Sequence, residues 1–352
     1  MLTKRSRRSG LMACALVGLV AITSVVPYAS DSAEIVRLRN ALVLDNVEST
    51  RFDWAPAAAP ADFAMERAPA SPAFRQRVRA LGVDRPGNDW QRALAIGRHL
   101  LENRRSKVGD AIESDLEGTY RVIRATGGGY CGDYTRVYSA MALAAGLTVR
   151  SWAFSFDGFG GHGHVFNEVW DSQSASWRMI DVFHNYVVTA ADGRPLSALE
   201  FRDAILHAEE FPRLVPIEPS TVPVFEYERK AREFYRRGMA EWYLWWGNQV
   251  FSYDNALLVR VFGPVSRALE QLGGIAQGVY PHIRVVVDDE NRSLFRSMHW
   301  LKVHLLVALA AVIGAIVVGA VIVASGYRAR RQASTRIAEP SADALGIKNN
   351  VG

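Results

Sequence analysis

The pattern of apolar and polar positions sets off one uninterrupted apolar run near the C-terminal end of the chain. Residues 305–325 read LLVALAAVIGAIVVGAVIVAS, without a charge or a proline. At a rise of about 1.5 Å per residue, a helix of this length crosses a hydrocarbon layer of roughly 30 Å. We therefore expect a transmembrane helix at residues 303–326. Because basic residues follow it, the positive-inside rule predicts a basic cytoplasmic tail at residues 327–352.

A second apolar stretch, at residues 10–30, follows the basic letters KRSRR. It predicts either a cleaved signal peptide or a retained signal anchor, with residues 1–9 as a basic cytoplasmic tail. Residues 11–14, LMAC, superficially resemble a lipoprotein box, but the apolar run follows the cysteine instead of preceding it, so lipidation is not expected. Both interpretations export residues 31–304 and predict a protein of the inner membrane whose exported part faces the periplasm.

The exported region begins without a regular pattern. Residues 54–72 read WAPAAAPADFAMERAPASP, and we interpret residues 31–85 as an Ala/Pro-rich tether. Apolar residues at helical spacing then predict helices at residues 89–104 and 116–125, and a third at 131–146 that stops at a glycine.

Alternating and β-prone residues follow these helices. They predict strands at residues 147–156, 164–170 and 177–183, separated by a glycine-rich loop and a turn. Helices followed by an antiparallel meander indicate an α+β domain, which we place at residues 86–215. Beyond it the chain becomes helical and rich in aromatic residues, which predicts a helical extension at residues 216–302.

The net charge of +5 does not indicate a nucleic-acid-binding protein, because it lies at the chain ends. The first 30 residues carry four positive charges and no acid, and residues 326–352 carry five positive and two negative charges. The part between them is left with a net charge of −2. No basic surface therefore remains for DNA or RNA.

The chain has two cysteines, and only one of them lies in the exported domain. Cys14 belongs to the N-terminal apolar run, so Cys131 has no disulfide partner in its own domain. Cys131 follows three glycines and opens a predicted helix, where unpaired N–H groups and the helix dipole favour a thiolate. The alternative is a small buried apolar side chain, the role of most free cysteines.

A histidine and an aspartate lie on the two strands of the predicted hairpin. His164 and Asp181 have an index sum of 345, the same as Trp170 and Ala175, which flank the turn. In that register His164 and Asp181 face each other directly, with Cβ atoms about 4.5–5.5 Å apart. A register slipped by two residues makes them diagonal neighbours on one face. In either register the carboxylate can orient the imidazole.

Three segments together resemble the transglutaminase-like superfamily, and the chain is similar to a bacterial, membrane-anchored member of it. They are GGYCGDYTRVYSAMALAAGLTVRS at residues 128–151, GHVFNEVWD at 163–171 and WRMIDVF at 177–183. The letters ALAIGRHLLEN at 93–103 resemble the family's preceding helix, and the likeness covers about residues 86–190.

The resemblance implies a papain-like fold in which a nucleophile helix packs on an antiparallel sheet, and a Cys-His-Asp triad. Matched residue by residue, Cys131 is the nucleophile, His164 the general base and acid, and Asp181 the residue that orients the histidine. No cofactor is implied. The Cys131 backbone N–H is one candidate oxyanion donor, and Trp90 or Gln91 is a candidate for the second.

The same residues allow other interpretations. His162 and His164 have the spacing of two metal ligands, with Cys131 or Asp181 as a third; otherwise His162 is a loop residue that lines the cleft.

Three further features near the site stay open. Glu168 shares the His164 face, but we interpret it as a solvated strand carboxylate. His184 and Asn185 are either neighbours that support Asp181 or ordinary polar loop residues. The aromatic run 242–246 is interpreted as helix packing, with sugar stacking or contact with the bilayer interface as alternatives.

The leading hypothesis is a membrane-anchored thiol enzyme that forms a thioester with an amide or ester carbonyl and passes the acyl group to water or to an amine. Such a peptidase, amidase or acyltransferase would act on a protein, peptide or other amide-bearing envelope substrate and would contact the lipid bilayer. The alternative is a catalytically silent scaffold or assembly module of an envelope or polysaccharide-production complex. Residues 216–302 would then bind an envelope protein partner.

Overall fold

The chain folds into two compact units. The computed structural model describes residues 4–47, 51–104, 110–112, 114–207, 211–221, 224–225 and 228–338. One unit comprises Asp31–Lys302, and the other comprises the two ends of the chain, Met1–Ser30 and Val303–Gly352. The helices are α1 (Lys4–Val25), η1 (Val26–Ala29), α2 (Ser32–Leu42), η2 (Pro56–Ala58), α3 (Pro72–Ala80), α4 (Asp89–Leu101), α5 (Leu116–Thr126), α6 (Cys131–Ala144), α7 (Ala198–His207), α8 (Glu228–Arg237), η3 (Met239–Glu241), α9 (Val250–Asn255), α10 (Leu257–Phe262), α11 (Arg267–Ala276) and α12 (Arg292–Ala338). The strands are β1 (Val149–Ser155), β2 (Gly163–Asp171), β3 (Ser176–Asp181), β4 (Tyr186–Thr189), β5 (Arg213–Pro216), β6 (Trp242–Trp245) and β7 (Ile283–Val285).

Two of the described helices are long and apolar enough to cross a membrane. These segments are Arg5–Ala29, with mean hydropathy 2.2, and Arg292–Ala329, with mean hydropathy 3.0. Within this unit the Ser24 hydroxyl lies 2.9 Å from Nε2 of His304. The part of the predicted basic tail beyond residue 338 lies outside the described residues.

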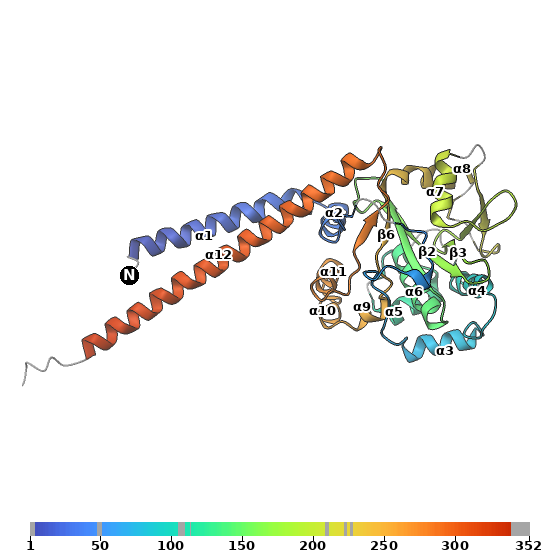
Figure 1. The fold of residues 1–352 in the computed structure, drawn as a ribbon. Helices are drawn as coiled ribbons and strands as arrows, with labels where there is room; N and C mark the ends of the chain where they lie inside the picture. Colours follow the sequence, from blue (N-terminus) through green and yellow to red (C-terminus); the bar gives the residue numbers. More distant parts are fainter. Residues whose placement is uncertain are drawn as a thin grey trace, which may run out of the picture. The chain divides into compact units, whose positions relative to one another are not determined.

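The unit that contains Cys131 is an α+β fold built on a seven-stranded sheet, as the sequence pattern predicts (Figure 1). The strand order is β5-β4-β3-β2-β1-β6-β7, and every neighbouring pair is antiparallel. The predicted helices and strands from residue 89 to residue 183 all form, with their ends within a few residues of the expected positions.

The β2–β3 hairpin adopts the second of the two registers considered above. Trp170 pairs with Trp177, not with Ala175, and Asp171 pairs with Ser176. Paired residues therefore sum to 347, and the loop comprises residues 172–175. Of the two registers that the sequence left open, the structure has the one slipped by two residues, because the four-residue loop lies one position later in the chain. The two residues are diagonal neighbours on one face.

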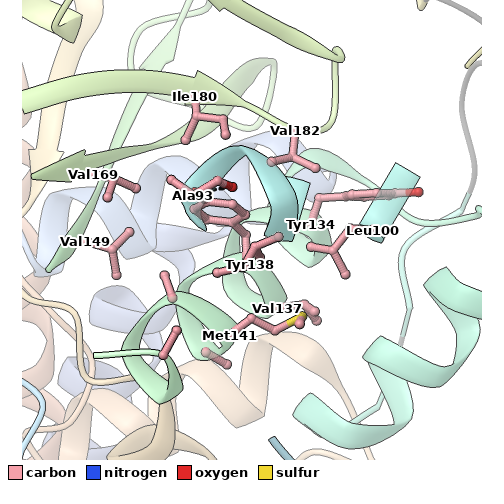
Figure 2. Packing of buried hydrophobic residues seen from close by; sticks show 14 of the residues in the cluster. Ala93, Leu100, Tyr134, Val137, Tyr138, Met141, Val149, Val169, Ile180 and Val182 are labelled. Atoms are coloured by element: carbon pink, nitrogen blue, oxygen red, sulfur yellow. Dashed lines mark hydrogen bonds between the residues drawn. The ribbon is translucent and has the colours of Figure 1, made fainter. Parts of the chain in front are cut away.

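One face of the sheet is covered by α4 and α6 through an aliphatic core, to which α5 contributes by packing on these two helices. Figure 2 shows Tyr138, Val137 and Met141 of α6 packed among side chains from α4 and from strands β1 to β3. Tyr138 and Met141 have no exposed surface. Burial of side chains of this size stabilises the fold by roughly 1.5–3 kcal/mol each. The helix that begins at Cys131 is thereby held rigidly on the sheet.

The other face carries an aromatic core, and the segment expected to be a tether supplies part of it. Phe52, Trp54 and Phe63 are buried there, and the Trp54 ring lies 5.4 Å from that of Trp177. The interpretation of residues 31–85 as a tether is therefore corrected. The Ala and Pro residues do interrupt regular structure, but the aromatic side chains between them remove large apolar areas from water. Two helices, α2 and α3, also lie within this range.

The aromatic run 242–246 is corrected as well, because it forms strand β6 instead of a helix. Trp242 pairs with Phe154 of β1, and the side chains alternate between the two faces of the sheet. Trp242 and Leu244 belong to the aromatic core, whereas Tyr243 and Trp245 line a pocket on the opposite face. Aromatic residues favour strands when both faces are covered. The extension expected to be helical thus completes the sheet.

Candidate active site

Helix α6 starts at Cys131 because the glycines before it permit an abrupt turn. Gly127 ends α5 with φ of 67°, and a Cβ there would lie 2.5 Å from the Cα of Arg104. Gly129 has φ of 107°, a conformation that residues with a side chain rarely adopt. Cys131 follows as the first residue of the helix. The glycine-rich segment therefore places the thiol at a helix N-terminus.

The start of α6 is fixed by a buried carboxylate. Asp133 is 1% exposed, and its Oδ2 accepts hydrogen bonds from the N–H groups of Tyr130 and Ile112, both at 3.0 Å. Its Oδ1 lies 3.2 Å from Nη2 of Arg267 on α11. Asp133 thus satisfies an N–H group that the helix start leaves unpaired. The backbone N–H of Cys131, in the first turn of α6, lies at the same end of the helix.

Polar contacts fix α6 against strand β2, which carries His164. The Thr135 hydroxyl donates to the carbonyl oxygen of Val165 at 3.1 Å, and the Asn167 amide donates to the Ser139 hydroxyl at 2.9 Å. Thr135 lies one helical turn beyond Cys131, and Val165 follows His164 directly. The position of the thiol is therefore coupled to that of the imidazole through neighbouring residues.

The structure brings together Cys131, His164 and Asp181, the three residues singled out in the sequence. Nε2 of His164 lies 2.6 Å from Oδ2 of Asp181, and both side chains are about 1% exposed. Cys131 and His164 line the same pocket, and the thiol contributes to the raised pKa of the imidazole. Because Nε2 faces the carboxylate, Nδ1 is the ring nitrogen left for the thiol. Cys131 itself is partly exposed, so a substrate can reach it.

The carboxylate of Asp181 is the centre of a larger network than the sequence predicts. Its Oδ2 also accepts a hydrogen bond from the Tyr235 hydroxyl at 2.6 Å and faces Nδ1 of His184 at 3.0 Å. Its Oδ1 accepts from the His184 backbone N–H at 3.0 Å. The His184 ring stacks on that of His164 with centroids 4.0 Å apart. His184 is therefore a supporting neighbour, one of the two interpretations left open above.

Tyr235 is the residue that the sequence analysis missed. It lies on α8, has no exposed surface and comes 54 residues after Asp181. A tyrosine in an aromatic-rich helical segment carries no motif, since packing explains it equally well. Asn185 takes a different role from His184, because its amide donates to the carbonyl oxygen of Glu218 at 2.9 Å.

The two histidines and the aspartate of the network have differently shifted pKa values. Burial lowers the pKa of His164, but the charge and hydrogen bond of Asp181, together with Cys131, outweigh burial and raise this pKa to about 9. Burial opposes ionisation of Asp181, yet the two neighbouring imidazoles hold the pKa of Asp181 well below its usual range. Burial and the positive charge of His164 lower the pKa of His184 to about 4. At neutral pH, His164 is cationic, Asp181 anionic and His184 neutral.

The residues that could ligate a metal differ from those expected from the sequence. His162 is exposed and its Nδ1 lies 2.9 Å from Asp157, so it does not join His164 in a ligand set. Among the described residues, His164, Asp181 and His184 do place one ligand atom each within 4.8 Å of one another. These atoms already bond to one another, and a cation would have to displace the bond from His164 to Asp181. The arrangement suits a hydrogen-bond network better than a metal centre.

Glu168 is not the solvated carboxylate that the alternating pattern suggested. It has no exposed surface, and its Oε2 lies 2.7 Å from Nε of Arg150 and 2.6 Å from the indole nitrogen of Trp152. Its Oε1 accepts from the backbone N–H of Ala198 at 2.6 Å. Strand β2 is covered on both faces, so alternation does not mark a solvent side. Glu168 pairs with a buried cation and contacts none of the three candidate residues.

Neither upstream candidate for the second oxyanion donor lies near Cys131. Asp89, the first residue of α4, accepts a hydrogen bond from the N–H of Ser172 at 3.2 Å, so α4 begins at the β2–β3 turn. His164 lies at the other end of β2, seven or more residues away and thus about 20 Å along the strand. Trp90 and Gln91 therefore belong to the opposite end of the hairpin.

A pocket of about 350 Å³ opens beside the thiol, which is at the lower end of the range for small-molecule sites. Cys131 and His164 line one side of it. The other walls come in part from α2, β6, α9 and α11, which belong to the segments interpreted above as the tether and the extension. The site is therefore completed by chain segments on both sides of the motif-bearing region.

Helix α2 also holds the loop that precedes His164. Asn40 of α2 is fully buried, and its Nδ2 donates to the carbonyl oxygen of Phe159 at 2.7 Å. The N–H of Gly161 donates to the carbonyl oxygen of Ala33 at 3.1 Å. Phe159 has φ of 61°, which is rare for a bulky residue and is maintained by these surroundings. The loop enters β2 in one fixed conformation.

Comparison with known proteins identifies the central part of the chain. Residues 79–182 match the family model described as the transglutaminase-like superfamily. This range contains all three candidate residues and starts seven residues before the expected boundary at residue 86. No curated protein and no solved structure gives a significant match to the chain.

Proposed function

We propose that this chain, whose residues 79–182 form a transglutaminase-like superfamily domain, is a cysteine-dependent enzyme of acyl transfer or acyl hydrolysis. The observation that carries the proposal is the position of one imidazole beside both a thiol and a buried carboxylate: His164 lines one pocket with Cys131 and lies 2.6 Å from Asp181. A weak nucleophile is activated when a base lies beside it and a third group orients that base.

The proposed reaction begins with Cys131 as a thiolate beside the protonated His164, which holds the proton of the thiol. The sulfur lone pair attacks the carbonyl carbon of an amide or ester, and the carbonyl π electrons move to the oxygen. When the tetrahedral intermediate collapses, the bond to the leaving amine or alcohol breaks, and His164 returns its proton to that leaving group. A thioester on Cys131 remains. Water or an amine then attacks it, and His164 accepts the proton of the incoming nucleophile. Collapse of the second tetrahedral intermediate breaks the bond to sulfur and restores the thiolate beside the protonated His164.

The charges of the network suit these steps. A cationic His164, with its pKa raised to about 9, stabilises a neighbouring thiolate and is also the acid that the leaving group needs. Asp181 holds the ring orientation through Nε2 and stabilises its positive charge. The N–H of Cys131, in the first turn of α6, is the proposed donor to the developing oxyanion.

The proposed enzyme is anchored in a membrane. Two helices at the chain ends are long and apolar enough to span a bilayer. The basic residues outside both apolar segments place both ends in the cytoplasm, if the first segment is retained. The domain between them then faces the periplasm, where an envelope protein, peptide or other amide is the substrate.

An activated ester tests the proposal without knowledge of the natural substrate. A Cys14→Ser background leaves Cys131 as the sole thiol. We expect p-nitrophenyl acetate to give a burst of about one p-nitrophenol per protein, with an acetyl group on Cys131 that hydroxylamine removes. The Cys131→Ser variant should show no burst. A folded wild-type protein without any burst or adduct would overturn the proposal.

A non-catalytic scaffold is the second candidate function. It is favoured by the size of the region outside the family match, since α8 to α11 and both apolar helices lie beyond residues 79–182. Many of these segments also complete the fold, which a scaffold and an enzyme both need. Complementation of a deletion strain separates the two. Full rescue by Cys131→Ala supports the scaffold, and loss of rescue at equal protein level supports the enzyme.

A further inference from the structure

The pocket beside Cys131 contains an arginine whose charge no carboxylate compensates. Three arginines line the pocket: Arg39, Arg136 and Arg267. Arg136 pairs with Asp254 at 2.7 Å, and Arg267 pairs with Asp133 at 3.2 Å. Among the described residues, no carboxylate lies within ion-pair distance of Arg39, whose partners are amide oxygens.

The pocket's own carboxylate does not take this role. Glu270 lines the pocket and is 7% exposed. Burial and the nearby charge of this carboxylate raise the pKa of Tyr253. Glu270 forms no ion pair with Arg39, whose bonds go to amide oxygens, so the positive charge of Arg39 stays available to a ligand.

The guanidinium of Arg39 is held in place by neutral groups. Its Nε and Nη2 donate to Oδ1 of Asn40 at 3.1 and 2.7 Å, and Nη1 donates to Oε1 of Gln271 at 3.2 Å. It also lies 5.4 Å from the ring centroid of Trp245 and 5.8 Å from that of Tyr280. Asn40, Gln271 and the two rings come from α2, α11, β6 and the segment before β7, so four parts of the fold fix one cation.

These three bonds leave two N–H groups of the Arg39 guanidinium without a bond to Asn40 or Gln271. A guanidinium has five N–H groups, and the three bonds to Asn40 and Gln271 use one each on Nε, Nη1 and Nη2. One N–H remains on Nη1 and one on Nη2. Two such donors match the two oxygens of a carboxylate, which arginine binds in a bidentate manner. The aromatic rings beside the guanidinium provide an apolar wall for the rest of the ligand.

We propose that Arg39 is a substrate-binding residue, and that the acyl donor carries a free carboxylate which Arg39 binds while the scissile carbonyl lies at Cys131. This inference deepens the proposed acyl-transfer function and rests on it, because both groups line one pocket of about 350 Å³. A pocket of this size accepts a short chain between the carbonyl and the carboxylate. The substrate class is therefore an anionic amide or ester, such as an acidic peptide segment.

Two thiol-directed probes of the same shape test the charge preference. N-(3-carboxypropyl)maleimide carries a carboxylate a few bonds from the electrophile, and N-butylmaleimide is its neutral counterpart. In the Cys14→Ser full-length protein, each second-order rate constant for Cys131 is measured at pH 7. The preference is the ratio of the anionic to the neutral rate constant, corrected by the same ratio for a small free thiol.

The variants isolate Arg39 from the rest of the site. We expect Arg39→Gln to reduce the preference about fivefold or more, mainly by slowing the anionic probe, since the variant removes the positive charge that attracts the carboxylate. Arg39→Lys should retain most of the preference because it keeps the charge. Arg121→Gln, an exposed arginine of α5 outside the pocket, should leave the ratio unchanged.

The outcomes separate this inference from the proposed function. A ratio that Arg39→Gln does not change, with Cys131 reactive toward both probes, overturns the carboxylate site and leaves the thiol enzyme intact. Loss of reactivity toward both probes to the same degree in Arg39→Gln also overturns it, because it indicates a packing role. A wild-type Cys131 that reacts no faster than a small free thiol with either probe contradicts the proposed function, and the inference falls with it.

Discussion

The hydroxyl of Tyr235 lies 2.6 Å from Oδ2 of Asp181, the same oxygen and the same distance at which that carboxylate meets His164. Tyr235 lies on α8, outside the family match, yet it donates a hydrogen bond to the group that orients the imidazole. The domain and the segment that follows it therefore share one buried polar network.

Replacing Tyr235 with Phe tests this relationship. The ring keeps its packing, but a buried carboxylate loses one donor, which costs about 1–3 kcal/mol of folding stability. We expect the Cys131 alkylation rate to fall two- to tenfold, because Asp181 is less firmly held. Tyr138→Phe, a fully buried tyrosine of α6 whose hydroxyl donates to the carbonyl oxygen of Ala93, is the matched control for removal of a hydroxyl. An unchanged alkylation rate in Tyr235→Phe would show that the hydroxyl does not support the site.

Asp181 and His164 should contribute unequally to reactivity. His164→Ala removes the group that exchanges the proton and is expected to slow alkylation of Cys131 by about 10²-fold or more. Asp181→Asn leaves the imidazole in place and should slow it less, because an orienting group contributes less than the base. Both rates are measured with iodoacetamide in the Cys14→Ser background. Equal losses in the two variants would contradict the assigned roles.

The two stacked imidazoles predict a stability optimum near pH 6.5. The pKa of His164 is raised to about 9, so its stabilisation is complete below the unfolded value of 6.5 and is lost as pH rises through 9. The pKa of His184 is lowered to about 4, so its contribution is present above pH 6.5 and is lost as pH falls through 4. Each pKa shift corresponds to about 3 kcal/mol over its full interval.

Urea unfolding of the Asp31–Lys302 unit within the full chain, followed by tryptophan fluorescence from pH 4 to 10, measures both limbs. His184→Gln should flatten the acidic limb and leave the alkaline one. His164→Gln should flatten the alkaline limb and also weaken the acidic one, because the charge of His164 helps to lower the pKa of His184. An alkaline limb that persists unchanged in His164→Gln would contradict the raised pKa of this histidine.

Breaking the buried ion pair of Glu168 and Arg150, which lies away from the site, should lower the stability of the fold without changing the reactivity of Cys131. Glu168 and Arg150 are both fully buried and lie 2.7 Å apart. Glu168→Gln leaves the guanidinium without its counter-charge and should lower the free energy of unfolding by about 3–5 kcal/mol. Alkylation of Cys131 per folded molecule should stay within twofold of wild type. A large loss of reactivity at full folding would instead tie Glu168 to the site.

The sequence predicted the central helices and strands because local patterns determine them. The glycines before Cys131, the periodicity of α6 and the alternation of β2 act over a few residues each. The register of the hairpin was open by two residues, because either choice puts His164 and Asp181 on the same face. The residue types around the turn are compatible with both positions of the loop, so the sequence did not determine the register.

The missed parts depend on contacts between distant segments. Trp54 packs against Trp177 although 123 residues separate them, and Tyr235 meets Asp181 across 54 residues. Alanine and proline around Trp54 gave the composition of a tether, and only the buried ring reveals a core segment. Likewise, the position of Arg39 in the pocket requires α2 to fold back on the loop before His164. No motif in the sequence carries that information.

The most direct test of the central claim is the rate of Cys131 alkylation by iodoacetamide as a function of pH, in the Cys14→Ser full-length protein. We predict a rate at pH 6–7 about 10²-fold or more above that of His164→Ala, since the cationic imidazole stabilises the thiolate. This advantage should disappear as pH passes about 9, where His164 loses its proton. A wild-type profile that coincides with that of His164→Ala at every pH would contradict a thiol activated by His164.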